Sequence, residues 1–226
     1  GQGFPPQGPG QPYLPRAHEL MKTAPLSTIR STVVTTLLPA ALLYWIALSW
    51  SAAEGISSTK VLRDLAQACD APLGQGFLSS IGYLLWMAAA AIALFAAATH
   101  LIRGSTVNRQ FAFCGGGFSL WLCLDDMFLV HDRYLGESFL YVTYAVFTVL
   151  LLFCFRAPLK KFGGDTFFLS VVFLGSSVLI DSFQGLFPAS YETVQLFEEG
   201  AKFLGIAAWL AFWCHYVNAT SKLSSF

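Results

Sequence analysis

The sequence predicts an all-α membrane protein with six transmembrane helices in one bundle. Three observations support this fold class. Hydrophobic residues make up 55% of the 226-residue chain and charged residues only 12%, whereas about 25% of a soluble domain is charged. The chain also contains six long apolar stretches, and its basic residues gather in alternate connections between them. We therefore expect the protein to lie in a lipid bilayer.

The six apolar stretches justify the individual helices. Each is close to or above the length of about 20 residues that a helix needs to cross the hydrocarbon core. Only a segment that satisfies its own backbone hydrogen bonds can cross, so each stretch is expected to be helical. In chain order the stretches are Thr32–Ala52, Gly76–Ile102, Gln110–His131, Ser138–Phe155, Thr166–Leu186 and Thr193–Val217.

The rest of the chain forms tails and connections around this transmembrane domain, which we expect to cover residues 31–217. Residues 1–30 are predicted to be a Pro/Gly-rich N-terminal tail, and residues 218–226 a short C-terminal tail. The composition of residues 1–15 cannot bury enough apolar surface to order itself. Order in such a tail would indicate a partner that holds it, so the tail and the apolar helix faces make other membrane subunits candidate partners. Nothing in the sequence suggests a nucleic-acid partner.

The distribution of Lys and Arg predicts the orientation of the bundle. With six crossings, both termini share one side with the second and fourth connections. That side carries nine basic residues and the opposite side three, and basic residues favour the cytoplasmic side. The nine are Arg16, Lys22, Arg30, Arg103, Arg109, Arg156, Lys160, Lys161 and Lys222, and the three are Lys60, Arg63 and Arg133. We therefore expect a multi-pass protein with both termini in the cytoplasm, in a bacterial inner membrane or an equivalent organelle membrane.

Small residues predict where helices pack closely. They occur at Ala88–Ala91, at Gly115–Gly117 and from Gly175 to Ser177. Small side chains let helices approach one another in lipid, where no hydrophobic effect drives helices together. We expect these positions to be packing seams.

Six carboxylates lie inside or at the rim of the predicted helices. They are Asp125, Asp126, Asp132, Asp181, Glu198 and Glu199. Odd-numbered helices run outward and even-numbered helices return, so the third and fifth helices reach their acids shortly before they end, and the sixth shortly after it begins. At about 1.5 Å per residue this alternation places five of them in one band, roughly 6–10 Å inside the outer boundary, with Asp132 at the outer mouth of the third helix. Ionisable groups at membrane depth are rare and are usually functional.

The charge balance of this band indicates what the site needs. Six acids stand against Lys202 and Arg133, with His131 also present. Glu198 and Lys202 are four residues apart in the order that favours an ion pair on one helix. The remaining negative charge cannot stay unpaired in a low dielectric. Protonation of some acids, access of water, or a bound cation would resolve the excess.

A divalent metal is one way to neutralise the band. Oxygen donors with at most one imidazole suit Mg²⁺, Ca²⁺, Mn²⁺ or a carboxylate-bridged iron pair better than zinc. The candidate ligands are Asp125, Asp126, His131, Asp181, Glu198 and Glu199, with Lys202, Asp132 and Arg133 as charge partners.

Three functions follow from this reading and stay open at the level of the sequence. The first is a cation-binding polar site between the third, fifth and sixth helices, either catalytic on a lipid-soluble substrate or simply binding. The second is an accessory subunit of a larger membrane complex, in which the acids form an inert network that fixes helix packing. The third is proton or cation transport, although the cytoplasmic halves of these helices offer few polar relays.

Two segments carry a resemblance to known proteins. Leu124–Asp132 (LDDMFLVHD) and Phe197–Gly205 (FEEGAKFLG) resemble the signature DD-x-F-x-x-H-[ED] … E-[DE]-G-x-K-x-x-G of bacterial multi-pass membrane proteins without an assigned function. This likeness covers the third to sixth helices and implies no activity. Leu124–Met127 is also similar to a stretch of alkaline ceramidase-like membrane hydrolases, which bind zinc through an HxxxH pair in a late helix. This chain has only His215 there, so the zinc site that the likeness implies lacks its ligands.

Overall fold

The computed structural model describes residues 33–58, 62, 69, 75–188 and 190–223. Within these residues the regular structure is helical throughout, without a strand, and this confirms the predicted all-α class. The chain divides into two compact units, residues 1–75 and 76–226. The predicted tail at residues 1–30 lies outside the described residues.

The first unit contains one long helix. A π-helical turn, Val33–Leu37, leads into α3, Leu38–Ala53. Pro39 stands in the first turn of α3, where its missing N–H costs no intrahelical hydrogen bond. Helix α3 corresponds to the first predicted stretch.

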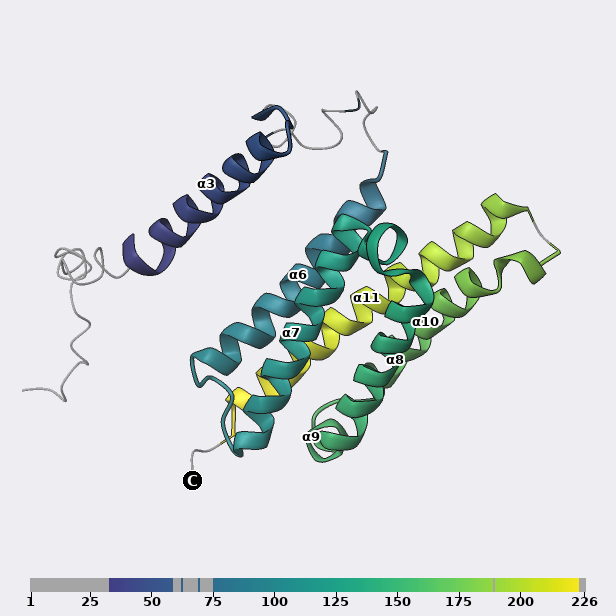
Figure 1. Cartoon of the computed structure of the whole chain (residues 1–226). Helices are drawn as coiled ribbons and strands as arrows, with labels where there is room; N and C mark the ends of the chain where they lie inside the picture. The colour runs from purple at the N-terminus through teal and green to yellow at the C-terminus, as the bar shows by residue number, and fades with distance from the viewer. Residues whose placement is uncertain (1–32, 59–61, 63–68, 70–74, 189, 224–226) are drawn as a thin grey trace, which may run out of the picture. The chain divides into compact units, whose positions relative to one another are not determined.

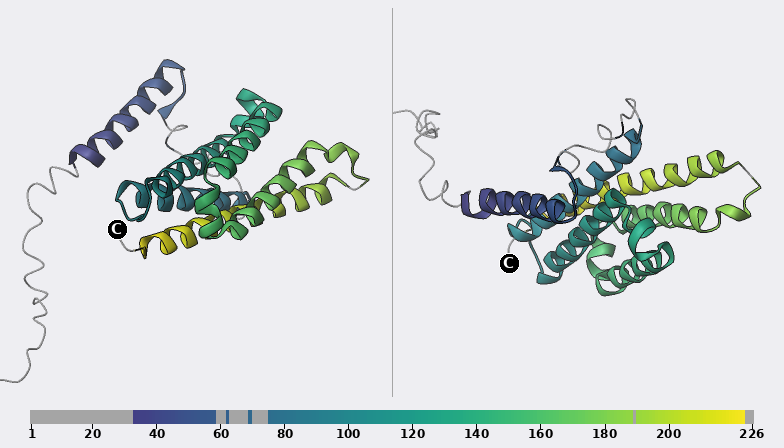
Figure 2. Two further views of the ribbon diagram at one scale, coloured as in Figure 1. Left: turned by 90° about the horizontal axis from the view of Figure 1, so that it is seen from below. Right: turned by 45° about the horizontal axis from the view of Figure 1, so that its top comes forward.

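Five long helices form the second unit (Figure 1). They are α6 (Phe77–Ala98), α7 (Thr106–Phe128), α8 (Glu137–Cys154), α10 (Gly164–Ser182) and α11 (Tyr191–Ser221). Helices α6 and α7 pack as one pair and α10 and α11 as another, and α11 also packs against α6, which joins the two pairs. Figure 2 shows α11 running through the length of the unit.

Short elements connect α8 to its neighbours. A π-helical turn, η2 (His131–Leu135), precedes α8, and the short helix α9 (Arg156–Lys161) leads from α8 to α10. From α9, α8 and α10 diverge (Figure 1). A 3₁₀ turn, η3 (Gln184–Leu186), follows α10. This arrangement leaves α8 beside α7 while α10 packs on α11.

Local sequence explains where these helices begin. Gly136 before α8 has φ +76° and Gly163 before α10 has φ +101°, a backbone conformation that glycine adopts readily and other residues do not. Ser190 caps α11, because its hydroxyl oxygen accepts the backbone N–H of Thr193 at 3.3 Å. Helix α11 ends at Ser221, four residues beyond the predicted boundary at Val217, so part of the predicted C-terminal tail is helical.

Aromatic side chains fill the half of the second unit that lies nearer to α9. Centroids of neighbouring rings are 4.9–6.4 Å apart, within the range of favourable aromatic pairs. The Trp209 N–H donates to the Ser119 hydroxyl at 2.7 Å, and the Tyr216 hydroxyl donates to the Asn108 carbonyl at 3.0 Å. These bonds fix α11 against α7. The rings with at most 1% of their surface exposed belong to Phe111, Phe167, Trp209, Phe212, Trp213 and Tyr216.

The predicted packing seam at Gly115–Gly117 is confirmed in part. A Cβ at Gly116 would lie 3.0 Å from the Leu94 backbone N. Gly205, which was not among the predicted seams, packs as closely, because a Cβ there would lie 2.9 Å from the Leu174 backbone N. In contrast, a Cβ at Gly117 or Gly175 would meet no atom within 4 Å. The predicted Gly115–Gly117 seam therefore holds for its buried residues only, and Gly175 borders open space.

The structure supports membrane association through a subset of the predicted spans. Two described helices, α6 and α10, are long and apolar enough to cross a bilayer. Residues Leu38–Ala53 and Ser138–Cys154 are apolar but shorter, and α7 and α11 contain acids within their length. The six-span arrangement stays a prediction.

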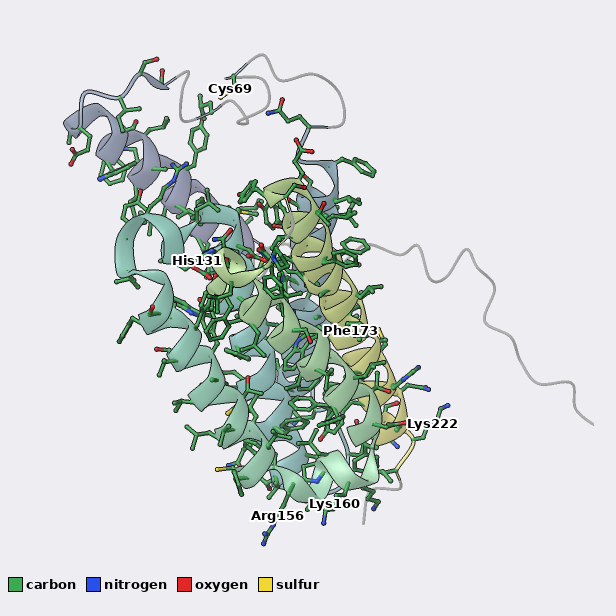
Figure 3. The ribbon with its side chains drawn as sticks, turned by 90° about the vertical axis from the view of Figure 1, so that its right-hand side faces the viewer. Cys69, His131, Arg156, Lys160, Phe173 and Lys222 are labelled. Atoms are coloured by element: carbon green, nitrogen blue, oxygen red, sulfur yellow. The ribbon has the colours of Figure 1, made fainter. Side chains whose placement is uncertain are left out.

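The two ends of the second unit differ in charge. Arg156, Lys160 and Lys222 lie at the end formed by α9 and the last turn of α11, whereas His131 lies toward the opposite end (Figure 3). The second end, where α7 and α10 finish and α8 and α11 begin, carries the carboxylates predicted to form a band. We refer to these as the basic end and the acidic end.

Candidate functional site: an acidic cavity between five helices

A cavity of about 900 Å³ opens at the acidic end of the second unit. Side chains from α6, α7, α8, α10 and α11 line it, together with His131 of η2. Five of the six predicted acids lie on its wall, and they come from three helices. They are Asp125, Asp126, Asp181, Glu198 and Glu199. We call this space the acidic cavity.

Asp126 holds three helices together at the cavity wall. Its Oδ1 lies 2.6 Å from the Lys202 Nζ of α11, and its Oδ2 accepts the indole N–H of Trp86 of α6 at 3.2 Å. Both carboxylate oxygens therefore have donors, and the charged one gives the stronger bond. Sequence spacing placed Lys202 within reach of the acids of its own helix and did not indicate this ion pair, which crosses from α11 to α7.

Asp125 points away from Asp126, as expected for adjacent residues of a helix. It is 4% exposed, and both of its oxygens contact one residue. The His131 backbone N–H donates to Oδ1 at 2.8 Å, and His131 Nδ1 lies 2.9 Å from Oδ2. Leu129 between them has φ +53°, which ends α7 and turns the chain back so that His131 reaches the carboxylate. Asp125 thus fixes the turn that leads into α8.

Asp181 connects α10 to α8 across the cavity. Its Oδ2 accepts the Tyr141 hydroxyl at 2.7 Å. Tyr141 lies one turn into α8 and its ring is 6.0 Å from the His131 ring, centroid to centroid. A hydrogen bond therefore joins α8 to α10 at the acidic end, while α9 connects the same helices at the basic end.

Glu198 and Glu199 enter the cavity wall one turn before Lys202 on α11. Glu198 is half-buried and Glu199 is exposed. The lining of the acidic cavity contains five carboxylates but only two basic side chains, those of Lys202 and His131. Lys202 and His131 contact Asp126 and Asp125, so these two basic side chains cannot neutralise all five carboxylates of the lining.

The other two predicted charge partners, Asp132 and Arg133, belong to the turn η2. Arg133 is exposed in η2 and is not among the residues that line the cavity. The backbone of Asp132 lies in the same turn, and its side chain is outside what the structure describes.

The predicted metal ligands share the cavity but do not converge on one point. Among the described residues, no three His, Cys, Asp or Glu side chains form a group that could hold a metal ion. The carboxylate oxygens of Asp125 and Asp126 already contact His131, Lys202 and Trp86. The divalent metal inferred from the sequence stays a prediction.

Aromatic residues complete the site, and sequence reasoning missed them. Trp86 and Tyr83 lie on α6, and Tyr141 and Tyr144 lie on α8, two helices that were not assigned to the site. Each pair is three residues apart near the acidic end of an apolar helix, so both members share a helix face. Tyr and Trp at such positions need partners for their O–H and N–H groups. That pattern was the signal for a polar site facing α6 and α8.

A separate apolar hollow of about 300 Å³ lies between α7 and α8. Gly117, Phe113 and Phe147 line it, and none of its lining residues carries a formal charge. Phe118 and Tyr144 lie between this hollow and the acidic cavity, since they line both.

Comparisons with known proteins bear on the family of this chain. Neither the curated proteins nor the solved structures include a match to this chain. One family model, described as a domain of unknown function (DUF8692), matches residues 33–216. The match covers α3 to α10, α11 as far as Tyr216, and every lining residue of the acidic cavity. The chain therefore belongs to the DUF8692 family.

Proposed function

We propose that all six long helices cross the bilayer, with both termini in the cytoplasm and the acidic end on the other side. Large apolar side chains cover the outside of the second unit; Phe95, Phe153 and Phe168 are each more than 60% exposed, and an apolar surface of this kind suits lipid. Asp125 and Asp126 of α7 and Glu198 and Glu199 of α11 line the cavity instead. A membrane-impermeant maleimide should label the exposed Cys69 in intact cells. Protection of Cys69 until lysis would contradict this orientation.

We further propose that the acidic cavity binds a cation. One observation carries this function: five carboxylates from α7, α10 and α11 line one cavity whose basic lining residues are Lys202 and His131. Like charges that share a partly desolvated space repel one another, and the repulsion falls when a cation enters. A bound cation therefore stabilises the folded protein, because it reduces the repulsion between these carboxylates.

Binding fits the structure better than transport or a purely structural role. The aromatic core fills the bundle between the cavity and the basic end, which favours a closed pocket over a continuous path. A structural network explains Asp125 and Asp126, whose oxygens have donors. Asp181 also has a donor, the Tyr141 hydroxyl, but a neutral donor does not cancel the negative charge that Asp181 and Glu199 add to the same space.

Thermal unfolding of the purified protein in a nonionic detergent tests cation binding. Tetramethylammonium, Na⁺, Mg²⁺, Ca²⁺ and Mn²⁺ are compared at matched ionic strength, because screening alone changes the repulsion between carboxylates. We expect at least one cation to raise Tm in a saturable way, and Glu199→Gln to lower that response.

A matched control comes from the same helix. Glu192 stands in the first turn of α11, outside the cavity lining, so Glu192→Gln removes an acid without changing the site. It should leave the cation response unchanged. Equal shifts of Tm with all the salts, or the same shift in Glu199→Gln as in the unmodified protein, would show that the salts only screen the carboxylates and that the cavity binds no cation.

A further inference from the structure

The acidic cavity has a second part with different chemistry. From Tyr141 the lining of α8 continues to Leu152, and from Asp181 the lining of α10 extends back to Val171. At 1.5 Å per residue, both spans reach about 15 Å from the carboxylates toward the basic end. Along this length the lining is mainly apolar: Leu122, Val149, Leu152, Val171, Leu174 and Val178. The cavity is thus charged at one end and apolar along its length.

The apolar part is accessible from the side of the unit. Val149 and Leu152 of α8 and Leu179 of α10 line the cavity and are also exposed. These are the two helices that diverge from α9 (Figure 1). In the proposed membrane orientation this side faces lipid, so a lipid-soluble molecule reaches the cavity without crossing the acidic end.

The charged part selects the sign of the ligand. Asp181, Glu198 and Glu199 repel a phosphate, sulfate or carboxylate head group and attract a positive one. Aromatic rings of Tyr83, Trp86, Tyr141 and Tyr144 stand among these acids. Carboxylates together with aromatic faces are the groups that bind substituted ammonium ions.

The Tyr144 hydroxyl stands at the boundary between the two parts of the cavity. It is buried on the wall, one turn along α8 from Tyr141 and beside the Asp125 carboxylate. It supplies a further polar group near the head of a ligand.

From these observations we propose that the cation is the head group of a single-chain amphiphile. The head is an amine or quaternary ammonium with no anionic group beside it, and it lies among Asp181, Glu198 and Glu199. The alkyl chain lies between α8 and α10. With carbon–carbon bonds of about 1.5 Å, a span of about 15 Å accommodates roughly ten to twelve extended carbons. This inference rests on the cation site proposed above and identifies its ligand.

Gly175 offers a direct test of the chain-binding part. It lines the cavity six residues before Asp181, and a Cβ there would meet no atom within 4 Å. Gly175→Leu therefore fills the apolar part without a clash inside the protein. Gly117→Leu is the matched control, because Gly117 is equally open but lines the separate apolar hollow.

The experiment measures Tm in a nonionic detergent with tetramethylammonium and with alkyltrimethylammonium ions of six, ten and twelve carbons. Each buried methylene contributes about 0.8 kcal/mol, so we expect apparent affinity to rise at least tenfold between six and ten carbons. Gly175→Leu should lose this increase and keep the response to tetramethylammonium. Gly117→Leu should behave as the unmodified protein, and dodecyl sulfate at the same concentration should give no stabilisation.

The outcomes separate the two proposals. If tetramethylammonium stabilises the protein but chain length adds nothing, the cation site stands and the amphiphile is excluded. If the chain-length effect persists in Gly175→Leu, the chain binds elsewhere and the inference is overturned. If Tm is raised neither by ammonium ions of any length nor by metal ions, both proposals fail.

Discussion

At the scale of single residues, Lys202 is the cation that makes the acidic cavity compatible with folding. Its side chain is 30% exposed and pairs with Asp126, which is 11% exposed and also accepts the Trp86 N–H. Removing one member of a largely buried pair leaves the other charge uncompensated, which costs more than removing both.

We predict that Lys202→Met destabilises the protein by about 2–3 kcal/mol, below the value for a fully buried pair because Lys202 is partly exposed. Equilibrium unfolding in detergent measures the change. Adding Asp126→Asn to Lys202→Met should restore most of the loss. Equal stability of Lys202→Met and the unmodified protein would show that the pair has no structural role.

Residue identity also marks the limit of what the sequence predicts. The spacing of Glu198 and Lys202 indicates that they share a helix face, but it contains nothing about the ion pair of Lys202 with Asp126 of another helix. That ion pair depends on how α7 and α11 rotate about their axes. Packing of the whole bundle sets that rotation, and the helical period of one segment does not predict it.

At the scale of elements, the contact between α10 and α11 depends on a glycine. Gly205 allows the Leu174 backbone to approach, and its carbonyl accepts the Ser170 hydroxyl at 2.8 Å. Close backbone approach of this kind strengthens helix association in lipid. The contact places Asp181 of α10 near Glu198 and Glu199 of α11.

Gly205→Ala should therefore destabilise the protein by about 1–3 kcal/mol, because the new methyl group overlaps the Leu174 backbone. Gly200→Ala is the control on the same helix, where a Cβ meets nothing within 4 Å and alanine favours the helix by about 1 kcal/mol. Thermal unfolding compares the two. A Gly205→Ala variant as stable as Gly200→Ala is incompatible with the close contact between α10 and α11.

The helices themselves were largely predictable, since apolar runs of the required length are visible in the sequence. Their partners were less so. Gly116 and Gly175 look alike as small residues within apolar helices, yet one packs against Leu94 and the other borders the acidic cavity. The part played by α6 and α8 in the site was also missed, because their contribution is aromatic and carries no charge.

At the scale of the whole second unit, alternating helix direction explains why the acids meet. Asp126 ends one helix, Asp181 ends another, and Glu199 follows the start of a third, so antiparallel packing brings them to one end. The same alternation gathers Arg156, Lys160 and Lys222 at the opposite end (Figure 3). The gathering of the acids at one end of the unit could therefore be predicted without any knowledge of tertiary contacts.

Electrostatic coupling between Asp181 of α10 and Glu199 of α11 tests the shared cavity most directly. In the ligand-free protein at low salt, Asp181→Asn and Glu199→Gln should each raise Tm, since each removes repulsion, and Asn retains an acceptor for the Tyr141 hydroxyl. The combined variant should gain less than the sum of the two, by about 0.5–1 kcal/mol, because either change alone already removes their mutual repulsion. Strict additivity would mean that the two carboxylates do not face the same space, and would contradict the account.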